Sequence, residues 1–171
     1  SGRACFGTAL RIVDDAGSEL PRDGKTVGHL RAKGPWVSSG YMKLNEGLDR
    51  DGWLITGDMA VIDPLGHVTL TDRSKDVIKS GGEWISSIQL ENVALSHPEV
   101  LQAAVIAIPH EKWQERPLLL VVRRQGSTLD GQTLLDHMRP KIVSWWVPDA
   151  VEFLDEFPMT GTGKVQKLML R

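Results

Sequence analysis

The chain has 171 residues, of which 41% are hydrophobic and 25% are charged, and its net charge is −2. This composition is typical of a globular protein with one domain or two small ones. Neither half of the chain is basic, which argues against a nucleic-acid-binding protein. The single Cys5 rules out an internal disulfide framework and a metal site built from several cysteines, and it fits a reducing, cytoplasmic compartment. The apolar runs are shorter than the about 20 residues of a transmembrane helix, and peripheral membrane association stays open.

The first 72 residues or so are rich in Gly, Pro and Asp, and apolar and polar residues alternate in short runs between them. Such alternation predicts strands over residues 10–13, 27–33, 53–55, 59–62 and 67–71. Turns are predicted at residues 14–17 and at 63–66, where Asp-Pro-Leu-Gly combines a fixed φ at Pro with a left-handed position at Gly. We therefore expect a small all-β unit.

The pattern changes after Lys75, where helical spacing appears. Residues 86–96 are predicted to form a helix with Ser87 as its N-cap. Ile88, Val93 and Leu95 are expected near its apolar face.

Further along, two strongly apolar runs predict buried strands at residues 100–108 and 117–124. A helix is predicted at 129–138, a strand at 150–154, and the start of a basic amphipathic helix at 165–171. The second unit is therefore expected to be α+β. Because the sequence opens with Ser1 in the middle of a pattern, we expect it to be a piece of a longer chain.

Residues 53–58, Trp-Leu-Ile-Thr-Gly-Asp, form the first motif with chemical content. A strand that ends in Thr-Gly-Asp presents the Asp58 carboxylate at the edge of a β unit, where it can accept hydrogen bonds from ribose hydroxyls. The alternative, an aspartate that caps a turn, is the better interpretation of this motif alone.

Residues 72–84, Asp-Arg-Ser-Lys-Asp-Val-Ile-Lys-Ser-Gly-Gly-Glu-Trp, are the most informative segment. Arg73 and Lys75 alternate in a stretch expected to be extended, so their side chains would point to opposite sides. Gly81 and Gly82 predict a tight turn that offers backbone N–H groups. Cations, glycines and a Trp together indicate a nucleotide-handling loop; the alternative is a charged hairpin between two domains.

Residues 157–164 form a third motif, a glycine-rich loop that ends in Lys164 just before the predicted helix. A lysine on such a loop can be brought to a developing negative charge. The loop is not a Walker A motif, because Val165 follows the lysine. A helix-entry turn with a solvated lysine is an equally good interpretation of this motif alone.

Two other features are given no catalytic role. The five His residues have no metal-ligand spacing, so no metal site is predicted. The Trp145-Trp146 pair is expected to supply core packing and a partly exposed patch.

The three motifs occur in the order and rough spacing of the adenylate-forming superfamily, which contains acyl-CoA synthetases, luciferases and peptide-synthetase adenylation domains. Residues 53–58 resemble its ribose-binding motif, residues 72–84 its hinge motif, and residues 158–164 its catalytic-lysine motif. Residues 81–87 with 108–117 resemble the medium- and long-chain fatty-acyl-CoA synthetases most closely.

The resemblance implies an α+β fold in two parts. Residues 1–74 would be the barrel-like β subdomain that ends a large N-terminal domain. Residues 75–171 would be a mobile C-terminal lid with a mainly antiparallel sheet and flanking helices, and the hinge would lie at about 72–76.

The resemblance also assigns roles near the nucleotide. Asp58 would hold the ribose hydroxyls of ATP and AMP, and Arg73 would contact the nucleotide. Lys75 would contact the nucleotide and serve as the hinge about which the lid rotates. Lys164 would bridge the ATP phosphate and the substrate carboxylate during adenylation.

A second set of residues belongs to the other step. Lys79 and Trp84 would reach the adenylate in one of two domain orientations. Gly81, Gly82 and Glu83 would form the loop that meets the adenylate and the path of CoA.

The implied activity is that of an ATP-dependent fatty acid–CoA ligase, with ATP, CoA and a fatty acid as its cofactors and substrate. Mg²⁺ is also implied, with its ligands in the N-terminal domain of the same chain, so the 171 residues alone are expected to be inactive. The alternatives are a synthetase for an aryl or short-chain carboxylate, and a non-catalytic nucleotide-binding or regulatory module of the same fold.

Overall fold

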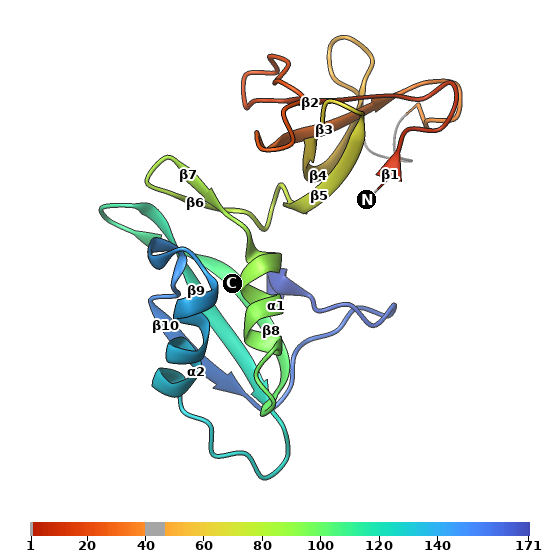
Figure 1. Ribbon diagram of the computed structural model, residues 1–171. Helices are drawn as coiled ribbons and strands as arrows, with labels where there is room; N and C mark the ends of the chain where they lie inside the picture. Colours follow the sequence, from red (N-terminus) through yellow and green to blue (C-terminus); the bar gives the residue numbers. More distant parts are fainter. Residues whose placement is uncertain (1, 40–46) are drawn as a thin grey trace. The chain divides into compact units, whose positions relative to one another are not determined.

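The computed structural model describes residues 2–39 and 47–171. The chain divides into two compact units, Ser1–Lys75 and Asp76–Arg171, which Figure 1 shows in red to yellow and in green to blue. Among the described residues, no helix is long and apolar enough to cross a membrane.

The first unit is a five-stranded antiparallel sheet. Its strands are β1 (Gly2–Arg3), β2 (Ala9–Val13), β3 (Gly28–Lys33), β4 (Leu54–Ile62) and β5 (His67–Arg73), in the spatial order β1-β5-β4-β3-β2. No pairing joins β1 to β2 in the described part of the unit, so the barrel-like sheet is open. One side of the sheet carries the core residues Ile12, Leu30, Ala60, Ile62 and Val68.

β4 differs from the prediction because it is one strand where the sequence suggested two. It continues through residues 56–58, and its pairing with β5 shifts register between Met59 and Ala60. Gly57 has a φ of +79°, a conformation that glycine adopts at little cost, so the strand bends there without ending. The predicted turn at 63–66 is confirmed: Gly66 has a φ of +82°, and its N–H donates to the Asp63 carbonyl at 2.9 Å.

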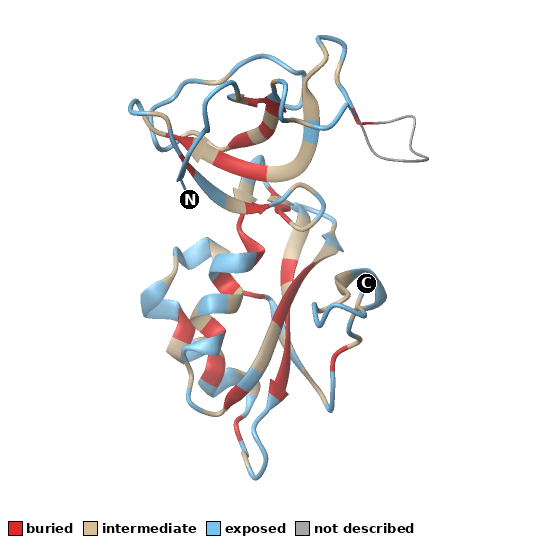
Figure 2. Ribbon diagram, turned by 90° about the vertical axis from the view of Figure 1, so that its right-hand side faces the viewer, coloured by how far each residue is buried: buried red, intermediate tan, exposed pale blue. Residues whose placement is uncertain are grey.

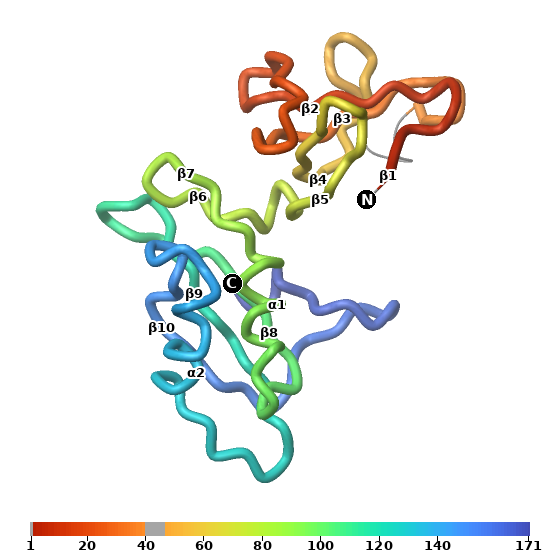
Figure 3. The backbone as a smooth tube through the Cα atoms, viewed as in Figure 1, coloured from red at the N-terminus to blue at the C-terminus, as the bar shows by residue number. Residues whose placement is uncertain are grey.

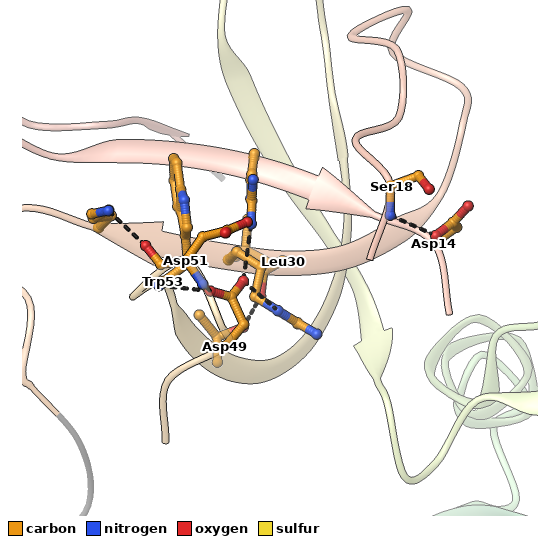
Figure 4. Close-up of polar contacts among 10 residues, drawn as sticks. Asp14, Ser18, Leu30, Asp49, Asp51 and Trp53 are labelled. Carbon is orange, nitrogen blue, oxygen red and sulfur yellow. Dashed lines mark hydrogen bonds and ion pairs between the residues drawn. The ribbon is translucent and has the colours of Figure 1, made fainter. Parts of the chain in front are cut away.

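The entry into β4 is fixed by the carboxylate of Asp49, as Figure 4 shows. Asp49 accepts hydrogen bonds from Arg11 Nη2 at 2.9 Å and from the backbone N–H groups of Asp51 and Trp53 at 3.0 and 2.9 Å. The Arg11 guanidinium also stacks on the Trp53 ring, 4.4 Å from its centroid. Burial raises the pKa of Asp49, but the hydrogen bonds from Trp53 and Arg11 outweigh it and hold this pKa below its usual range. These contacts therefore hold in place the residues that precede β4, the strand that carries Asp58.

The second unit combines five strands with two helices. The strands are β6 (Ile78–Ser80), β7 (Glu83–Ile85), β8 (Val100–His110), β9 (Gln114–Arg123) and β10 (Ala150–Leu154). The helices are α1 (Ser87–Leu95) and α2 (Gly131–Met138), with short 3-10 helices at Arg139–Lys141, Ser144–Trp146 and Lys167–Met169. β9 pairs antiparallel with β8 and parallel with β10, and the β6–β7 hairpin joins it where Ser80 lies opposite Gln114. This confirms the predicted mainly antiparallel sheet with flanking helices.

The two faces of this sheet are covered differently, as Figure 2 shows. The two helices pack on one face, where Val105 and Leu119 join the larger core. The opposite face presents Ile106 and Leu120, which pack against Phe157 of the C-terminal segment. Alternate residues of β8 and β9 thus serve two separate cores, as expected for a period of two.

Helix α1 corrects two sequence predictions. Its N-cap is Ser86, whose Oγ accepts from the Gln89 N–H at 3.3 Å, and Ser87 lies inside the helix. The buried face consists of Ser87, Leu90 and Ala94. These residues follow the i, i+3, i+7 spacing of a helix stripe. Ile88 and Leu95 are 41% and 44% exposed, so their predicted place on the apolar face was wrong, whereas Val93 packs against the core as predicted.

The helix predicted over residues 165–171 is also absent from the structure. Only a single 3-10 turn, Lys167–Met169, forms there. Val165 pairs with Met159 in an isolated antiparallel bridge, so the chain enters this region as part of a hairpin.

Candidate functional site

Asp58 and Arg73 lie side by side on neighbouring strands. They are directly opposite in the β4–β5 register, and Arg73 Nε is 3.8 Å from Asp58 Oδ1. Both side chains are accessible, with 31% of Asp58 and 67% of Arg73 exposed. An exposed carboxylate can accept hydrogen bonds from hydroxyl groups, and a guanidinium beside it can donate to an anion. The structure thus brings together two of the predicted nucleotide-binding residues.

The extended backbone ends at Arg73, and residues 74–76 form a turn. The Ser74 N–H donates to the Gly57 carbonyl at 2.9 Å, and the Ser74 hydroxyl lies 3.1 Å from His29 Nδ1. Because Lys75 lies in this turn, the prediction that Arg73 and Lys75 alternate along an extended segment was wrong. Lys75 is the last residue of the first unit, and its role as a hinge stays a prediction.

The tight turn predicted at the glycine pair is confirmed. Gly81 and Gly82 have φ values of +60° and +86° and connect β6 to β7 as a two-residue hairpin turn. On the flanking strands, Lys79 lies directly opposite Trp84, with its ammonium 6.0 Å from the ring centroid. Lys79 and Trp84 are therefore neighbours on one hairpin, and their predicted contact with the adenylate stays a prediction. Glu83 is the exposed first residue of β7.

A hollow of about 490 Å³ lies beside this hairpin, within the second unit. It is lined by Ser80, Gly81, Glu83, His110, Trp113, Arg116, Trp145 and Asp149. Trp113 contacts the turn closely: the Gly81 N–H donates to its carbonyl at 2.9 Å, and a Cβ at Gly81 would lie 2.8 Å from its Cε3 atom. Of the lining residues, only Gly81 and Glu83 were site residues predicted from the sequence.

Arg116 holds one wall of the hollow, a role that the sequence did not indicate. Its Nε and Nη2 atoms donate to Asp149 Oδ1 at 2.9 and 2.8 Å, and its Nη1 atom donates to the Trp145 carbonyl at 2.7 Å. The guanidinium is only 13% exposed, so its several partners offset the cost of its burial. As predicted for the tryptophan pair, Trp146 packs on the core, and Trp145 is 41% exposed.

Lys164 sits on a closed loop. The Thr160 N–H donates to the Lys164 carbonyl at 2.7 Å, and the Lys164 N–H donates to Thr160 Oγ1 at 3.1 Å. The Gln166 N–H donates to the Pro158 carbonyl at 2.8 Å and closes the base of the loop. Figure 3 shows this region in blue-violet as a projection from the second unit. The Lys164 side chain is exposed, and its ammonium has no hydrogen bond or ion pair with the described residues.

The described residues offer no metal centre. No group of three or more His, Cys, Asp or Glu side chains in residues 2–39 and 47–171 is arranged to hold a metal ion. The predicted location of the Mg²⁺ ligands in another part of a longer chain stays a prediction.

Comparisons with known proteins place these features in a family. The AMP-binding enzyme C-terminal domain family matches residues 89–164. The 3-methylmercaptopropionyl-CoA ligase of Ruegeria lacuscaerulensis is 52% identical over 171 residues, which cover 99% of this chain and 32% of the relative. The medium-chain-fatty-acid–CoA ligase of Ectopseudomonas oleovorans is 47% identical over 171 residues, covering 99% of this chain and 31% of the relative.

Solved structures agree with the sequence relatives. The crystal structure of ATP-bound MatB from Rhodopseudomonas palustris superposes with a TM-score of 0.87 at 34% identity, covering 99% of this chain and 34% of that one. The chain thus spans about a third of the length of the curated relatives it matches. The second unit therefore contains the AMP-binding enzyme C-terminal domain over residues 89–164, and the chain as a whole is similar to CoA ligases and adenylate-forming enzymes in its motifs, its fold and its relatives.

Proposed function

We propose that this chain is the C-terminal part of an ATP-dependent carboxylate–CoA ligase. In the first step, a carboxylate oxygen attacks the α-phosphorus of ATP, and pyrophosphate leaves with the electron pair of the broken P–O bond. In the second step, the CoA thiol loses its proton and attacks the acyl carbonyl, and AMP leaves. The observation that carries the proposal is the exposed Lys164 ammonium on its closed loop.

Lys164 would act in the first step. Two anions, the carboxylate and the triphosphate, must approach each other, and negative charge moves onto the departing pyrophosphate. A cation placed at that point stabilises the transition state more than the separated reactants. The loop suits this role because its backbone hydrogen bonds fix the lysine main chain while leaving the side chain accessible.

Asp58 and Arg73 would hold the nucleotide in both steps. The Asp58 carboxylate would accept hydrogen bonds from the ribose hydroxyls, and the Arg73 guanidinium beside it would donate to the nucleotide. Lys75, in the turn at the unit boundary, would also contact the nucleotide and would be the hinge between the domain 1–74 and the lid 75–171.

Rotation about this hinge would exchange the functional faces of the lid. The Lys164 loop serves adenylation, whereas the hairpin with Lys79, Trp84 and the loop Gly81, Gly82 and Glu83 serves the thiol step. The glycine turn and the Trp84 ring would be the parts of the hairpin that meet a ligand. Domain rotation of this kind lets one active site run two different reactions.

The substrate class is proposed more finely as a medium- or long-chain fatty acid. The medium-chain-fatty-acid–CoA ligase of E. oleovorans supports this assignment. The 3-methylmercaptopropionyl-CoA ligase of R. lacuscaerulensis, whose name specifies a short acid, supports the alternative of a short-chain carboxylate. Mg²⁺ would be held by residues outside the described chain, and a cytoplasmic location would fit the free thiol of Cys5.

The test uses the longer protein to which this chain belongs. It is incubated with ATP, Mg²⁺, CoA and a panel of propionate, 3-methylmercaptopropionate, octanoate, palmitate and cinnamate. The proposal predicts an acyl-CoA together with equal amounts of AMP and pyrophosphate, with octanoate or palmitate used best. Release of ADP and phosphate, or no acyl-CoA from any of the acids, would contradict the proposed ligase.

A further inference from the structure

Lys167 has an environment unlike that of Lys164, although only two residues separate them. Its Nζ atom lies 2.6 Å from Glu91 Oε1 and donates to Ser87 Oγ at 2.8 Å. The pair is largely buried, with 15% of the Lys167 side chain and 16% of the Glu91 side chain exposed. Glu91 Oε1 also accepts from the Val105 N–H at 2.8 Å, so the carboxylate connects α1, β8 and the C-terminal segment.

This cluster lies at the base of the Lys164 loop. The hydrogen bond from the Gln166 N–H to the Pro158 carbonyl closes the loop, and Lys167 is the next residue. Within the loop, Gly161 and Gly163 leave the backbone little intrinsic stiffness. The direction of the loop therefore depends on how its base is attached.

The base of the Lys164 loop packs on the sheet through apolar contacts and is joined to α1 by the ion pair between Lys167 and Glu91. Phe157 is 4% exposed and packs on one face of the sheet, and Val165 packs partly against the same cluster. Apolar contacts are not directional, whereas a buried ammonium held by a carboxylate and a hydroxyl has defined geometry. Ser87 is also the first residue of α1 and follows closely on β7, so the same contact links the Lys164 loop to the hairpin of Gly81 and Gly82.

We propose that Lys167, through its contacts with Glu91 and Ser87, is a positioning residue that holds the Lys164 loop in the orientation needed for adenylation. This inference rests on the proposed ligase function and adds a residue to it. Lys167 itself is largely buried and paired with Glu91, so its role is to fix the position of the loop. Of the two lysines, only Lys164 would contact the reacting groups. A misplacement of about 1 Å at a reacting group can cost about 100-fold in rate.

The test compares Lys167→Met, Lys167→Arg and Lys141→Met in the longer protein. Lys141→Met is a matched control, because Lys141 also donates to a serine and lies in the same unit, near His137. ATP–pyrophosphate exchange reports the first step, and acyl-CoA formation from supplied acyl-adenylate reports the second. Lys167→Met should lower exchange by about 10- to 100-fold and leave the second step nearly unchanged. Lys167→Arg should keep most of the exchange, and Lys141→Met all of it.

A further variant separates positioning from stability. Lys167→Met leaves the Glu91 carboxylate buried without this cation, which should lower the Tm. Adding Glu91→Gln removes that charge and keeps an acceptor for the Val105 N–H, so the double variant should recover Tm but not exchange. Recovery of exchange together with Tm, or equal loss of both steps in Lys167→Met, would overturn the inference. Absence of acyl-CoA formation by the unmodified protein would instead overturn the proposed function.

Discussion

The hairpin turn at Gly81 and Gly82 allows a sharp prediction, because both glycines have positive φ values but only Gly81 lies against Trp113. Both have left-handed φ values, +60° and +86°, which cost a residue with a side chain about 1–2 kcal/mol. A Cβ at Gly82 meets no atom within 4 Å, whereas a Cβ at Gly81 would lie 2.8 Å from the Trp113 ring. Gly81→Ala should therefore have a conformational cost similar to that of Gly82→Ala. It must also displace the Trp113 ring, which lowers the free energy of unfolding by about a further 1–3 kcal/mol.

The difference between the two variants is the quantity to measure. The loss of unfolded-state entropy on replacing Gly by Ala applies equally to both and cancels. One kcal/mol shifts Tm by about 4–8 °C in a unit of this size, so Gly81→Ala should melt at least about 4 °C below Gly82→Ala. Thermal unfolding of the 171-residue chain, followed by tryptophan fluorescence, measures this difference. Equal Tm values would refute the contact, as would a difference that persists when Trp113→Ala is added to both variants.

Four further predictions concern the nucleotide residue, the hinge, the pH dependence and the isolated chain. In the longer protein, Asp58→Asn should raise the KM for ATP by roughly 10- to 100-fold, since a hydrogen bond to a charged group contributes about 1.5–3 kcal/mol; an unchanged KM would exclude the ribose contact. Lys75→Pro should lock the turn and impair acyl-CoA formation from acyl-adenylate more than ATP–pyrophosphate exchange, and unchanged CoA transfer would exclude the hinge. Burial, then Lys141 and His97, hold the pKa of His137 below its usual range. The unfolded chain therefore binds more protons below about pH 6.5, and stability should fall as the pH drops below that value. The fall in Tm between pH 7.5 and 5.5 should be smaller in His137→Gln, and an equal fall in both proteins would contradict this. The isolated 171-residue chain should show no ATP–pyrophosphate exchange, and measurable exchange would mean that it contains a complete site.

The sequence predicted those parts of the fold that depend on local pattern. Alternation and turn residues are local signals, and they located β2, β3, β5 and the turn at Gly66. Apolar runs located β8 and β9, whereas the short strands β1, β6 and β7 were not predicted. The buried face of α1 was missed because Ser87, a small polar residue, is buried by a hydrogen bond to Lys167, 80 residues away. The break after Arg73 was missed because Ser74 is fixed by Gly57 and His29, which lie on other strands.

In the candidate site, too, features set by neighbouring residues could be predicted, and features set by residues far apart in the sequence could not. Gly81 and Gly82 carry their own conformational signal, so the turn could be predicted from two residues. Arg116 could not be assigned a role, since its main partner Asp149 lies 33 residues further along the chain. The pairing of Asp58 with Arg73 follows from the β4–β5 register, which the motifs alone do not specify.

The central claim, that Lys164 supplies the cation for adenylation, is tested most directly by Lys164→Ala in the longer protein. ATP–pyrophosphate exchange and acyl-CoA formation from supplied acyl-adenylate are measured on the same preparation. Removal of a group that stabilises developing charge costs about 100- to 1,000-fold, so exchange should fall at least that far while CoA transfer persists. Equal loss of both steps, or exchange that survives without Lys164, would contradict the account.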